Sequence, residues 1–259
     1  MAKFNTPRSI LITGASSGIG AALAREYAGK NVFLAISGRD RERLETVAGE
    51  CRARGAEVSA QIVDVTGRGP MRRWIEETDA VAPLDLVVAN AGISGGPGGG
   101  GGGGEDEEQV RDIFAVNMAG VLNTVIPAAD MMRKRGRGQI AIMSSLSAYR
   151  GLPTAPSYSA SKAAVKAYGE AMRTRLAAHG IKMSVICPGF VESRMTARNK
   201  FKMPFLMTAA KAARVIRRGL AKNRARIAFP WPMAAAMWLL SILPPWLGDR
   251  LLGILPEKE

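Results

Sequence analysis

Short apolar runs alternate with longer segments of helical composition along most of the chain. The apolar runs have the length of β-strands, and they are Ser9–Ile12, Val32–Ser37, Val58–Val63, Leu84–Ala89, Gln139–Met143, Lys182–Cys187 and Ile227–Phe229. An uninterrupted apolar run such as Leu84–Ala89 is typical of a parallel strand that is covered on both faces. The alternation therefore predicts an α/β fold, a doubly wound parallel sheet of about seven strands with helices on both faces.

The last thirty residues depart from this alternation. Ile227–Gly248 holds 22 residues without a charge, which is long enough to suggest a membrane span. Four prolines argue against a span: Pro230, Pro232, Pro244 and Pro245. They confine the uninterrupted helical run to Met233–Leu243, roughly 16 Å of helix against a hydrocarbon core of about 30 Å. With a second amphipathic piece at Trp246–Leu255, the sequence predicts an apolar helical tail over residues 231–259.

The first strand runs into a glycine-rich turn, from Thr13 to Gly20, that precedes a helix. Glycines at such a turn let the backbone approach a ligand closely, and a helix N-terminus offers free N–H groups to a pyrophosphate. The placement between strand and helix therefore predicts a dinucleotide site. Its candidate contacts in the turn are Gly14, Ser16, Ser17, Gly18, Ile19 and Gly20.

The ends of the next strands indicate which dinucleotide binds. In a dinucleotide fold the end of the second strand faces the adenosine ribose, and here Gly38-Arg39 leaves room for a 2′-phosphate and offers it a guanidinium. This favours NADP(H) over NAD(H), although Arg39 could also simply cap a charged surface. Asp64 and Val65, at the end of the third strand, suit contacts with the edge of the adenine ring. The small residues Asn90-Ala91-Gly92 leave space for the cofactor after the fourth strand.

Tyr158 and Lys162 lie four residues apart in a predicted helix, Ser157–Ala178, so both face the same side. A free tyrosine titrates near pH 10, and a nearby cation such as Lys162 would favour its phenolate. The pair alone is weak evidence, because the same spacing occurs on many solvated helices.

Taken together, the Thr13–Gly20 turn, Asn90-Ala91-Gly92, Asn117, Ser145, Tyr158, Lys162 and Pro188-Gly189 resemble the classical short-chain dehydrogenase/reductase family, in family order and spacing over about residues 8–230. The resemblance implies a Rossmann-like sheet and a catalytic tetrad of Asn117, Ser145, Tyr158 and Lys162. Ser145 is chosen over Ser144 and Ser147 because it lies thirteen residues before the tyrosine.

The resemblance also implies a role for each of these residues. Ser145 and Tyr158 would hold a substrate carbonyl, and Tyr158 would donate the proton. Lys162 would lower the pKa of the tyrosine and bind the nicotinamide ribose, while Asn117 would hold a water.

Further cofactor contacts are implied at Asn90, Ala91, Gly92, Pro188, Gly189 and Ser193. Two positions depart from the family pattern. Ser193 stands where the family usually has threonine, and Ser17 stands where some NADP-preferring members have a basic residue, which leaves Arg39 as the principal evidence for the phosphate.

The predicted function is an NADP(H)-dependent carbonyl reductase or alcohol dehydrogenase that acts on a lipophilic ketone or secondary alcohol. A catalytically silent NADP(H)-binding regulator or scaffold at a membrane surface is the alternative. We expect residues 1–230 to form the catalytic domain, with a substrate lid at about 190–225, and the chain to form a homodimer or homotetramer. The glycine run 95–104 reads as a mobile loop, with a flap beside the substrate as a minor hypothesis.

The net charge of +14 is concentrated in one part of the chain. From Arg194 to Arg226 there are eleven Lys/Arg and no acid. Beside an apolar tail with Trp231, Trp238 and Trp246, such a block suits an anionic membrane surface. The tail helices could instead cover the protein's own core or an oligomer interface. No nucleic-acid partner is expected, because interleaved aromatic residues and a binding motif are lacking.

Cysteine and histidine usage is sparse. The two cysteines, Cys51 and Cys187, give no disulfide framework, and with His179 as the one histidine we expect no metal site. No apolar run precedes the first strand, so we expect no secretory signal and a cytoplasmic protein, associated in the membrane-bound case with the inner face of a membrane.

Overall fold

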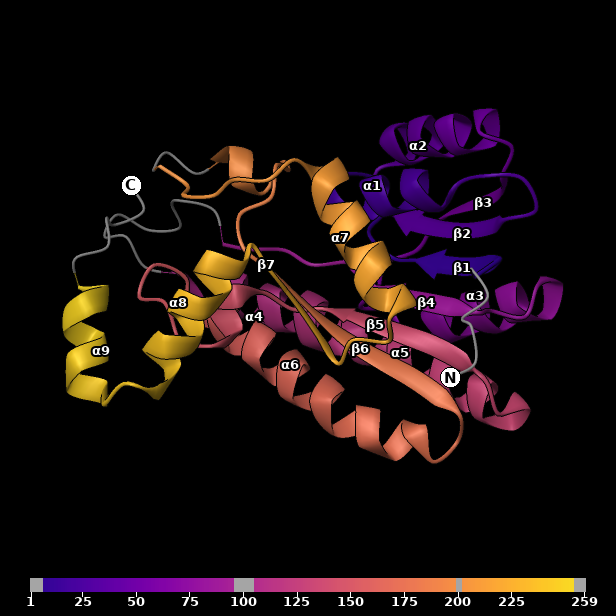
Figure 1. The fold of residues 1–259 in the computed structure, drawn as a ribbon. Helices are drawn as coiled ribbons and strands as arrows, with labels where there is room; N and C mark the ends of the chain where they lie inside the picture. Colours follow the sequence, from indigo (N-terminus) through magenta and orange to yellow (C-terminus); the bar gives the residue numbers. More distant parts are fainter. Residues whose placement is uncertain (1–6, 96–104, 199–201, 254–259) are drawn as a thin grey trace.

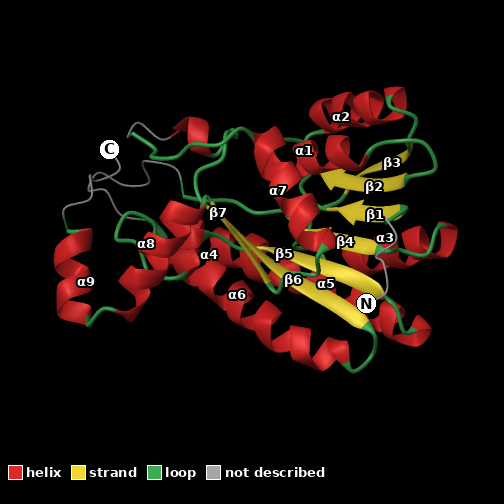
Figure 2. Ribbon diagram, viewed as in Figure 1, coloured by secondary structure: helices red, strands yellow, loops and turns green. Residues whose placement is uncertain are grey.

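A computed structural model describes residues 7–95, 105–198 and 202–253, and it contains one seven-stranded parallel sheet (Figures 1 and 2). The strand order is β3-β2-β1-β4-β5-β6-β7. The strands are β1 (Ser9–Ile12), β2 (Phe33–Gly38), β3 (Glu57–Ile62), β4 (Leu86–Ala89), β5 (Gly138–Met143), β6 (Ile181–Pro188) and β7 (Arg226–Phe229). The predicted doubly wound α/β fold is therefore confirmed, and every predicted strand is present within two residues of its expected ends.

Helices cover both faces of this sheet (Figure 1). They are α1 (Gly18–Tyr27), α2 (Arg41–Ala53), α3 (Arg68–Val81), α4 (Glu107–Phe114), α5 (Gly120–Arg135), α6 (Pro156–Ala177), α7 (Ala209–Ala221), α8 (Trp231–Ile242) and α9 (Pro245–Leu252). One core unites α1, α2 and α7 with one face of the strands, and a second core unites α3, α5 and α6 with the other. In β1, Ile10 and Ile12 belong to the first core and Leu11 to the second, because successive side chains in a strand point to opposite faces.

The helical stretch Glu107–Arg135 consists of α4 and α5, joined by a π-helical turn, η1 (Ala115–Ala119). By length and composition this is the one stretch among the described residues that could cross a membrane. Half of its apolar window is buried, and α5 packs in the second core, as expected for a helix of the protein interior. The first helix of this stretch, α4, is capped by Asp106, whose carboxylate accepts a hydrogen bond from the Gln109 amide at 2.7 Å.

The segment between β6 and β7 includes a core helix. On α7, Ala212, Ile216 and Leu220 are buried in the first core, and Arg217 forms an ion pair with Glu26 of α1 at 3.0 Å. The proposed lid spans residues 190–225. Because α7 is packed in this way, the second half of that segment covers one face of the sheet. Residues 199–201 of that proposed lid lie outside the described residues, as does most of the glycine run.

The predicted C-terminal extension is present as α8 and α9. The first of these begins at Trp231, two residues earlier than expected, with Pro232 in its first turn. Proline is tolerated there because the first N–H groups of a helix have no intrahelical partner. The first helix ends before Pro244, as the sequence predicted, and Pro245 is the first residue of α9, one residue earlier than the expected start at Trp246.

Two glycines in helices give a matched test of this packing. A Cβ at Gly169 of α6 would lie 2.6 Å from Cγ2 of Val185 on β6, whereas a Cβ at the exposed Gly49 of α2 would meet nothing within 4 Å. We expect Gly169→Ala to lower the free energy of unfolding by about 1–2 kcal/mol, because the stiff valine cannot turn away. We expect Gly49→Ala to raise it by about 0.5–1 kcal/mol through helix propensity. Urea unfolding measures both, and equal effects would contradict this account.

Candidate active site

The glycine-rich turn between β1 and α1 depends on residues without a side chain. Gly14 and Gly18 have φ angles of +66° and +56°, a region that favours glycine. A Cβ at Gly14 would also lie 2.7 Å from the Cα of Ala91, and one at Gly20 would collide with the Gly14 carbonyl and the Asn90 side chain. The turn therefore lies directly against the residues that follow β4.

Thr13 joins this turn to Asn90-Ala91, and sequence reasoning did not single it out. Its buried hydroxyl accepts hydrogen bonds from the Asn90 amide at 3.0 Å and the Ala91 amide at 3.1 Å. In return, Asn90 Nδ2 donates to the carbonyls of Thr13 and Gly14 at 2.9 and 3.1 Å. Asn90 thus has the backbone-positioning geometry expected of it. A threonine at the end of a first strand gives no local sign of this double acceptor role.

The N-terminus of α1 has the features of a phosphate site. Ser17 is the N-cap residue, and its side chain makes no capping hydrogen bond, so the first N–H groups of the helix are without a capping side chain. Ser16 and Gly18 flank it, and Ile19 packs against the first core. Gly14, Gly18 and Gly20 add no side chain of their own to this helix end. These residues therefore fit the pyrophosphate of a dinucleotide.

The ends of β2 and β3 lie next to this turn. A Cβ at Gly38 would be 2.9 Å from Cβ of Ser16, so this position has no room for the acidic side chain that would bind a free ribose hydroxyl. Arg39 follows it and is exposed. The pKa of Asp64 is lowered, mainly by a hydrogen bond from the Thr66 amide and to a smaller extent by the charge of Arg39. Asp40 caps α2 by accepting a hydrogen bond from the Arg43 amide at 2.9 Å.

Val65 and Gly120 are in close contact behind this edge. A Cβ at Gly120 would lie 2.6 Å from Cγ2 of Val65, which is 7% exposed. Asn123 also donates a hydrogen bond to the Val65 carbonyl at 2.9 Å. These contacts fix the backbone that follows β3 against α5.

Tyr158 and Ser145 meet at the end of β5. Ser145 precedes the short 3₁₀ helix η2 (Leu146–Ala148), and its hydroxyl makes a hydrogen bond with the Tyr158 phenol. The pKa of Tyr158 is raised, because burial disfavours the phenolate more than the hydrogen bond to Ser145 favours it. The expected lowering of this pKa by Lys162 is therefore not the net effect in this structure. At neutral pH the phenol is protonated.

Lys162 is buried one helical turn after the tyrosine. Its side chain is 2% exposed, and Nζ lies 5.7 Å from the centre of the Tyr158 ring. Nζ donates a hydrogen bond to the Met143 carbonyl at 3.0 Å. Burial lowers the pKa of Lys162 from 10.5 to about 8. A lysine with such a pKa can give up and regain a proton near neutral pH.

Asn117 lies in the π-helical turn and faces the lysine across Gly92. A Cβ at Gly92 would be 3.1 Å from both Asn117 Oδ1 and Lys162 Nζ, so glycine keeps these atoms unobstructed. Asn117 Oδ1 accepts from the Ile93 amide at 2.8 Å, and Nδ2 donates to the Ile93 carbonyl at 2.9 Å and Ser161 Oγ at 3.0 Å. The carboxamide is thus fixed by protein atoms, with one lone pair of Oδ1 remaining for a further donor.

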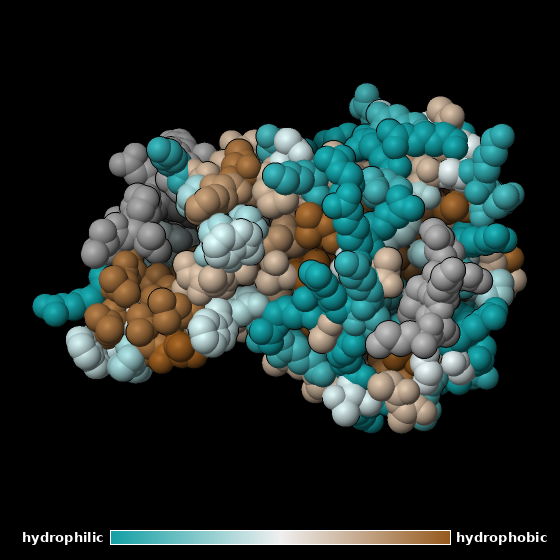
Figure 3. Space-filling model, viewed as in Figure 1, coloured by the Kyte–Doolittle hydropathy of each residue, from teal (hydrophilic) through white to brown (hydrophobic). Residues whose placement is uncertain are grey.

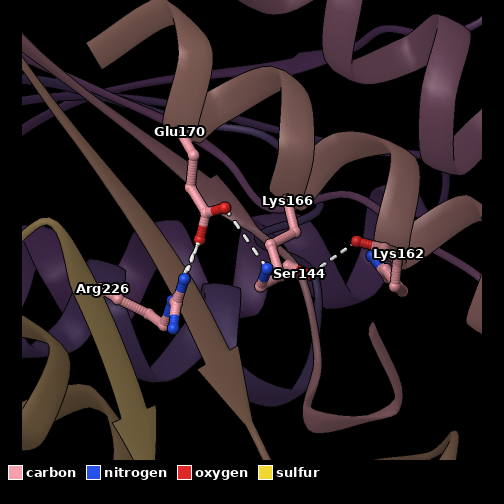
Figure 4. A network of polar contacts seen from close by, with 5 residues as sticks. All are labelled: Ser144, Lys162, Lys166, Glu170 and Arg226. Atoms are coloured by element: carbon pink, nitrogen blue, oxygen red, sulfur yellow. Dashed lines mark hydrogen bonds and ion pairs between the residues drawn. The ribbon is translucent and has the colours of Figure 1, made fainter. Parts of the chain in front are cut away.

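The three neighbouring serines have different surroundings. Ser144 Oγ donates to the Lys162 carbonyl at 2.8 Å, and Ser147 is 8% exposed (Figure 4 shows Ser144 and Lys162). Ser145 is the one in hydrogen-bonding contact with Tyr158. Ser145 therefore remains the serine that we propose for the tetrad.

The same face of α6 continues into a network of charges. Figure 4 shows Glu170 between Lys166 and Arg226 of β7. Lys166 Nζ lies 3.3 Å from Glu170 Oε2, and Arg226 Nε donates to Glu170 Oε1 at 3.0 Å. Both cations also lie over the Tyr149 ring, at 5.3 and 5.4 Å from its centre. This network joins α6, β7 and the loop after η2.

Pro188 is the last residue of β6, and Gly189 and Ser193 follow it. The Gly189 amide donates to the Phe229 carbonyl at 2.8 Å, and a Cβ at Gly189 would lie 2.6 Å from Met233 Sδ of α8. Ser193 lies beside Gly18 of the glycine turn, since a Cβ there would be 3.1 Å from Cβ of Ser193. The Ser193 and Thr196 hydroxyls are 3.2 Å apart. No cluster of metal ligands occurs among residues 7–95, 105–198 and 202–253.

Comparison with known proteins agrees with this geometry. An uncharacterized oxidoreductase of Myxococcus xanthus (strain DK1622) is 37% identical over 243 residues, which are 93% of this chain and 95% of that protein. The crystal structure of an actinorhodin polyketide ketoreductase with NADPH is similar with a TM-score of 0.75 and 26% identity, over 86% of this chain and 94% of that chain.

A short-chain dehydrogenase/reductase from Burkholderia phymatum, in complex with NAD, has a TM-score of 0.82 at 22% identity, over 99% of this chain and 98% of that chain, and this likeness concerns the fold. The family model for short chain dehydrogenases matches residues 8–203, which include the glycine turn and all four tetrad candidates. The chain therefore belongs to the short-chain dehydrogenase/reductase family and is an oxidoreductase.

Proposed function

We propose that this oxidoreductase uses NADP(H) to interconvert a lipophilic ketone and the corresponding secondary alcohol, as a carbonyl reductase or alcohol dehydrogenase. The observation that carries the proposal is the contact of Tyr158 with Ser145, one helical turn from the buried Lys162 and beside the glycine turn. An acid, a hydrogen-bond partner and a buried cation are thus gathered where a dinucleotide would bind.

The protonation states favour reduction. A phenol whose pKa is raised by burial stays protonated at neutral pH, so Tyr158 can donate a proton to a carbonyl oxygen that it shares with Ser145. When bound, the nicotinamide supplies or accepts the hydride. Lys162, with a pKa of about 8, is suited to hold the nicotinamide ribose and to return a proton toward Tyr158. We propose that Asn117 orients a water with the remaining lone pair of Oδ1, which lies beside Gly92.

The cofactor preference rests on the end of β2. Gly38 lies against Ser16, and the neighbouring charge is the exposed guanidinium of Arg39. A guanidinium can form charge-assisted hydrogen bonds with a 2′-phosphate. NADPH and NAD both occur in complexes of structurally similar proteins, so the preference for NADP(H) is drawn from this chain's own residues.

An apolar substrate is favoured by the residues next to the tetrad candidates. Leu146 follows Ser145 directly, and Met233 of α8 lies against Gly189. Both side chains belong to the small apolar cluster between η2, β6 and α8. The ketoreductase among the similar structures supports a carbonyl substrate.

We further propose a cytoplasmic homodimer or homotetramer whose apolar tail meets an anionic membrane surface.

The alternative function is an NADP(H)-binding regulator without turnover. All four tetrad candidates are present, which favours an enzyme. Ser145 contacts Tyr158, Lys162 Nζ lies 5.7 Å from the centre of the tyrosine ring, and Gly92 lies beside both Asn117 and Lys162.

Replacement of the proposed proton donor separates the two functions. We expect Tyr158→Phe to lower the turnover number for ketone reduction by about 10²-fold or more, because the acid is lost, and to leave NADPH affinity nearly unchanged. Tyr168→Phe, on the same helix, is the control and should keep full activity. NADPH oxidation, screened over 3-ketoacyl lipids, steroid-like ketones and keto-sugars, measures turnover. Full activity of Tyr158→Phe would refute the assigned mechanism.

The cofactor preference is tested at Arg39. We expect Arg39→Ala to raise the dissociation constant for NADPH by about tenfold or more and to leave that for NADH within about twofold, because only NADPH carries the 2′-phosphate. Arg41→Ala, at an exposed position two residues later, is the matched control. Fluorescence titration measures both cofactors. Equal losses for NADPH and NADH would mean that the phosphate is bound elsewhere.

The buried lysine predicts a pH-dependent stability. The folded pKa of Lys162, about 8, is below its ordinary value of 10.5, so between these values the unfolded chain binds more protons. Stability must then rise with pH across this window. We expect the free energy of unfolding of the wild type, relative to Lys162→Met, to increase by about 3 kcal/mol from pH 8 to 10.5. Urea unfolding at several pH values measures the difference, and a constant difference would contradict the prediction.

A further inference from the structure

Helix α8 has two apolar faces, and only one of them is covered. Met233, Ala234 and Met237 pack against the small cluster formed by Leu146, Val185 and Cys187. The opposite side, together with α9, exposes large apolar side chains. We call this surface the tail face, and it consists of Trp231, Trp238, Leu239, Ile242, Trp246 and Leu251. Figure 3 shows apolar side chains gathered at the end of the molecule formed by α8 and α9.

The exposure of the tail face is large. Trp231 is 78% exposed, Trp246 65% and Ile242 59%. Single exposed apolar residues are ordinary, whereas a group of this size on two consecutive helices marks a surface for association.

The tail face is held in a fixed place beside the candidate active site. Arg150, which follows η2, forms an ion pair with Asp249 of α9 at 2.7 Å, and Gly248 lies against the same guanidinium. At the other end of the tail, Met233 lies against Gly189. The loop that carries Ser145 and the end of β6 therefore both contact the tail, at the carboxyl end of the sheet (Figure 1).

A second exposed apolar segment precedes α7 and carries positive charge. Met195, Phe205 and Leu206 are exposed there, and so are the cations Arg194 and Lys202. This segment also reaches the end of the molecule at which α8 and α9 lie (Figure 1). No acidic residue occurs from Arg194 to Arg226, and α7 adds exposed cations that include Lys211 and Arg214. Exposed apolar side chains and the exposed cations Arg194 and Lys202 thus occur in the same segment.

This combination decides between the partners that could cover the tail face. In a twofold dimer through this face, the cation block of each copy would approach that of the other, and like charges oppose such an approach. An anionic lipid surface instead accepts both the cations and the apolar side chains, and tryptophan suits the boundary between headgroups and acyl chains. At twelve residues, α8 is roughly 18 Å long, too short to cross a hydrocarbon core of about 30 Å.

We propose that the tail face docks in the plane of an anionic bilayer surface and thereby turns the mouth of the active site toward the lipid. For the substrate this rests on the proposed function, because a lipophilic ketone would partition into the bilayer and reach Ser145 and Tyr158 past Leu146 and Met233. The docking itself requires only the tail face and the neighbouring cations.

Flotation with vesicles tests the docking of the full chain. The vesicles contain phosphatidylcholine alone, or phosphatidylcholine with phosphatidylserine at about three to one. We expect binding to the anionic vesicles, weakened by salt, and much less binding to the neutral ones. The combined variant carries Trp238→Gln, Leu239→Gln and Ile242→Gln. We expect its affinity for the anionic vesicles to fall by about tenfold or more, because its apolar contacts are lost. Arg194→Gln with Lys202→Gln should lower the preference for anionic lipid.

A matched control removes apolar surface elsewhere. Val81→Gln with Ile126→Gln changes two exposed apolar residues, 72% and 43% exposed, on α3 and α5, and should bind vesicles as the wild type does. Circular dichroism and the melting temperature establish that each variant is folded. Absence of wild-type binding at low salt, or equal binding by the tail-face variant, would overturn the proposal.

Two further measurements distinguish the remaining outcomes. If sedimentation shows an oligomer that only the tail-face variant dissociates, a second copy covers this face and the proposal fails. NADPH titration and reduction of a water-soluble ketone are measured without vesicles. If the wild type neither binds NADPH nor reduces the ketone, the proposed function is refuted, whereas the flotation result still stands.

Discussion

The burial of the Lys162 amine constrains how the catalytic helix lies against the sheet. A charged amine removed from water needs a partner, and here Nζ donates to the Met143 carbonyl at the end of β5. The next residue of that strand end, Ser144, donates in the opposite direction to the Lys162 carbonyl. These two bonds join the same two segments, so α6 cannot slide along β5 without breaking both. The position of Tyr158, one turn earlier on α6, follows from this attachment, and so does its contact with Ser145.

The cofactor side of the site depends on a comparable attachment between the first strand and the fourth. Thr13 accepts the amides of Asn90 and Ala91, and Asn90 returns hydrogen bonds to the turn. Gly92, two residues after Asn90, faces Lys162 and Asn117. The glycine turn and the tetrad candidates are therefore positioned by one short segment after β4. A displacement of this segment would alter dinucleotide binding and the surroundings of the lysine together.

The strands and the site were predictable from the sequence to different degrees. Strand positions followed from apolar runs such as Leu84–Ala89, because burial on both faces leaves a continuous pattern that needs no knowledge of distant contacts. The π-helical turn at Asn117 could not be read in this way. It depends on bonds to Ile93 and Ser161, which are 24 and 44 residues away. The same holds for Thr13, whose partners follow a different strand.

The electrostatics of the site were predicted least well. The spacing of Tyr158 and Lys162 correctly placed both on one helix face, but it suggested a lowered tyrosine pKa. The net shift is upward, since it is set by how many atoms from other elements exclude water from the phenol. Spacing along one helix contains no information about that burial. It also gave no indication that the lysine's own pKa would fall to about 8.

The network on α6 relates the catalytic helix to the tail. Tyr158, Lys162, Lys166 and Glu170 follow one another at intervals of four residues and so form one line along the helix. Glu170 binds Arg226, the first residue of β7, and β7 leads through Pro230 into α8. Side chains about one third exposed contribute little stability through such an ion pair, so its main effect is to set position. The helix that holds the proposed proton donor and the strand that leads to the tail are thereby attached to each other, which positions the start of α8 relative to α6.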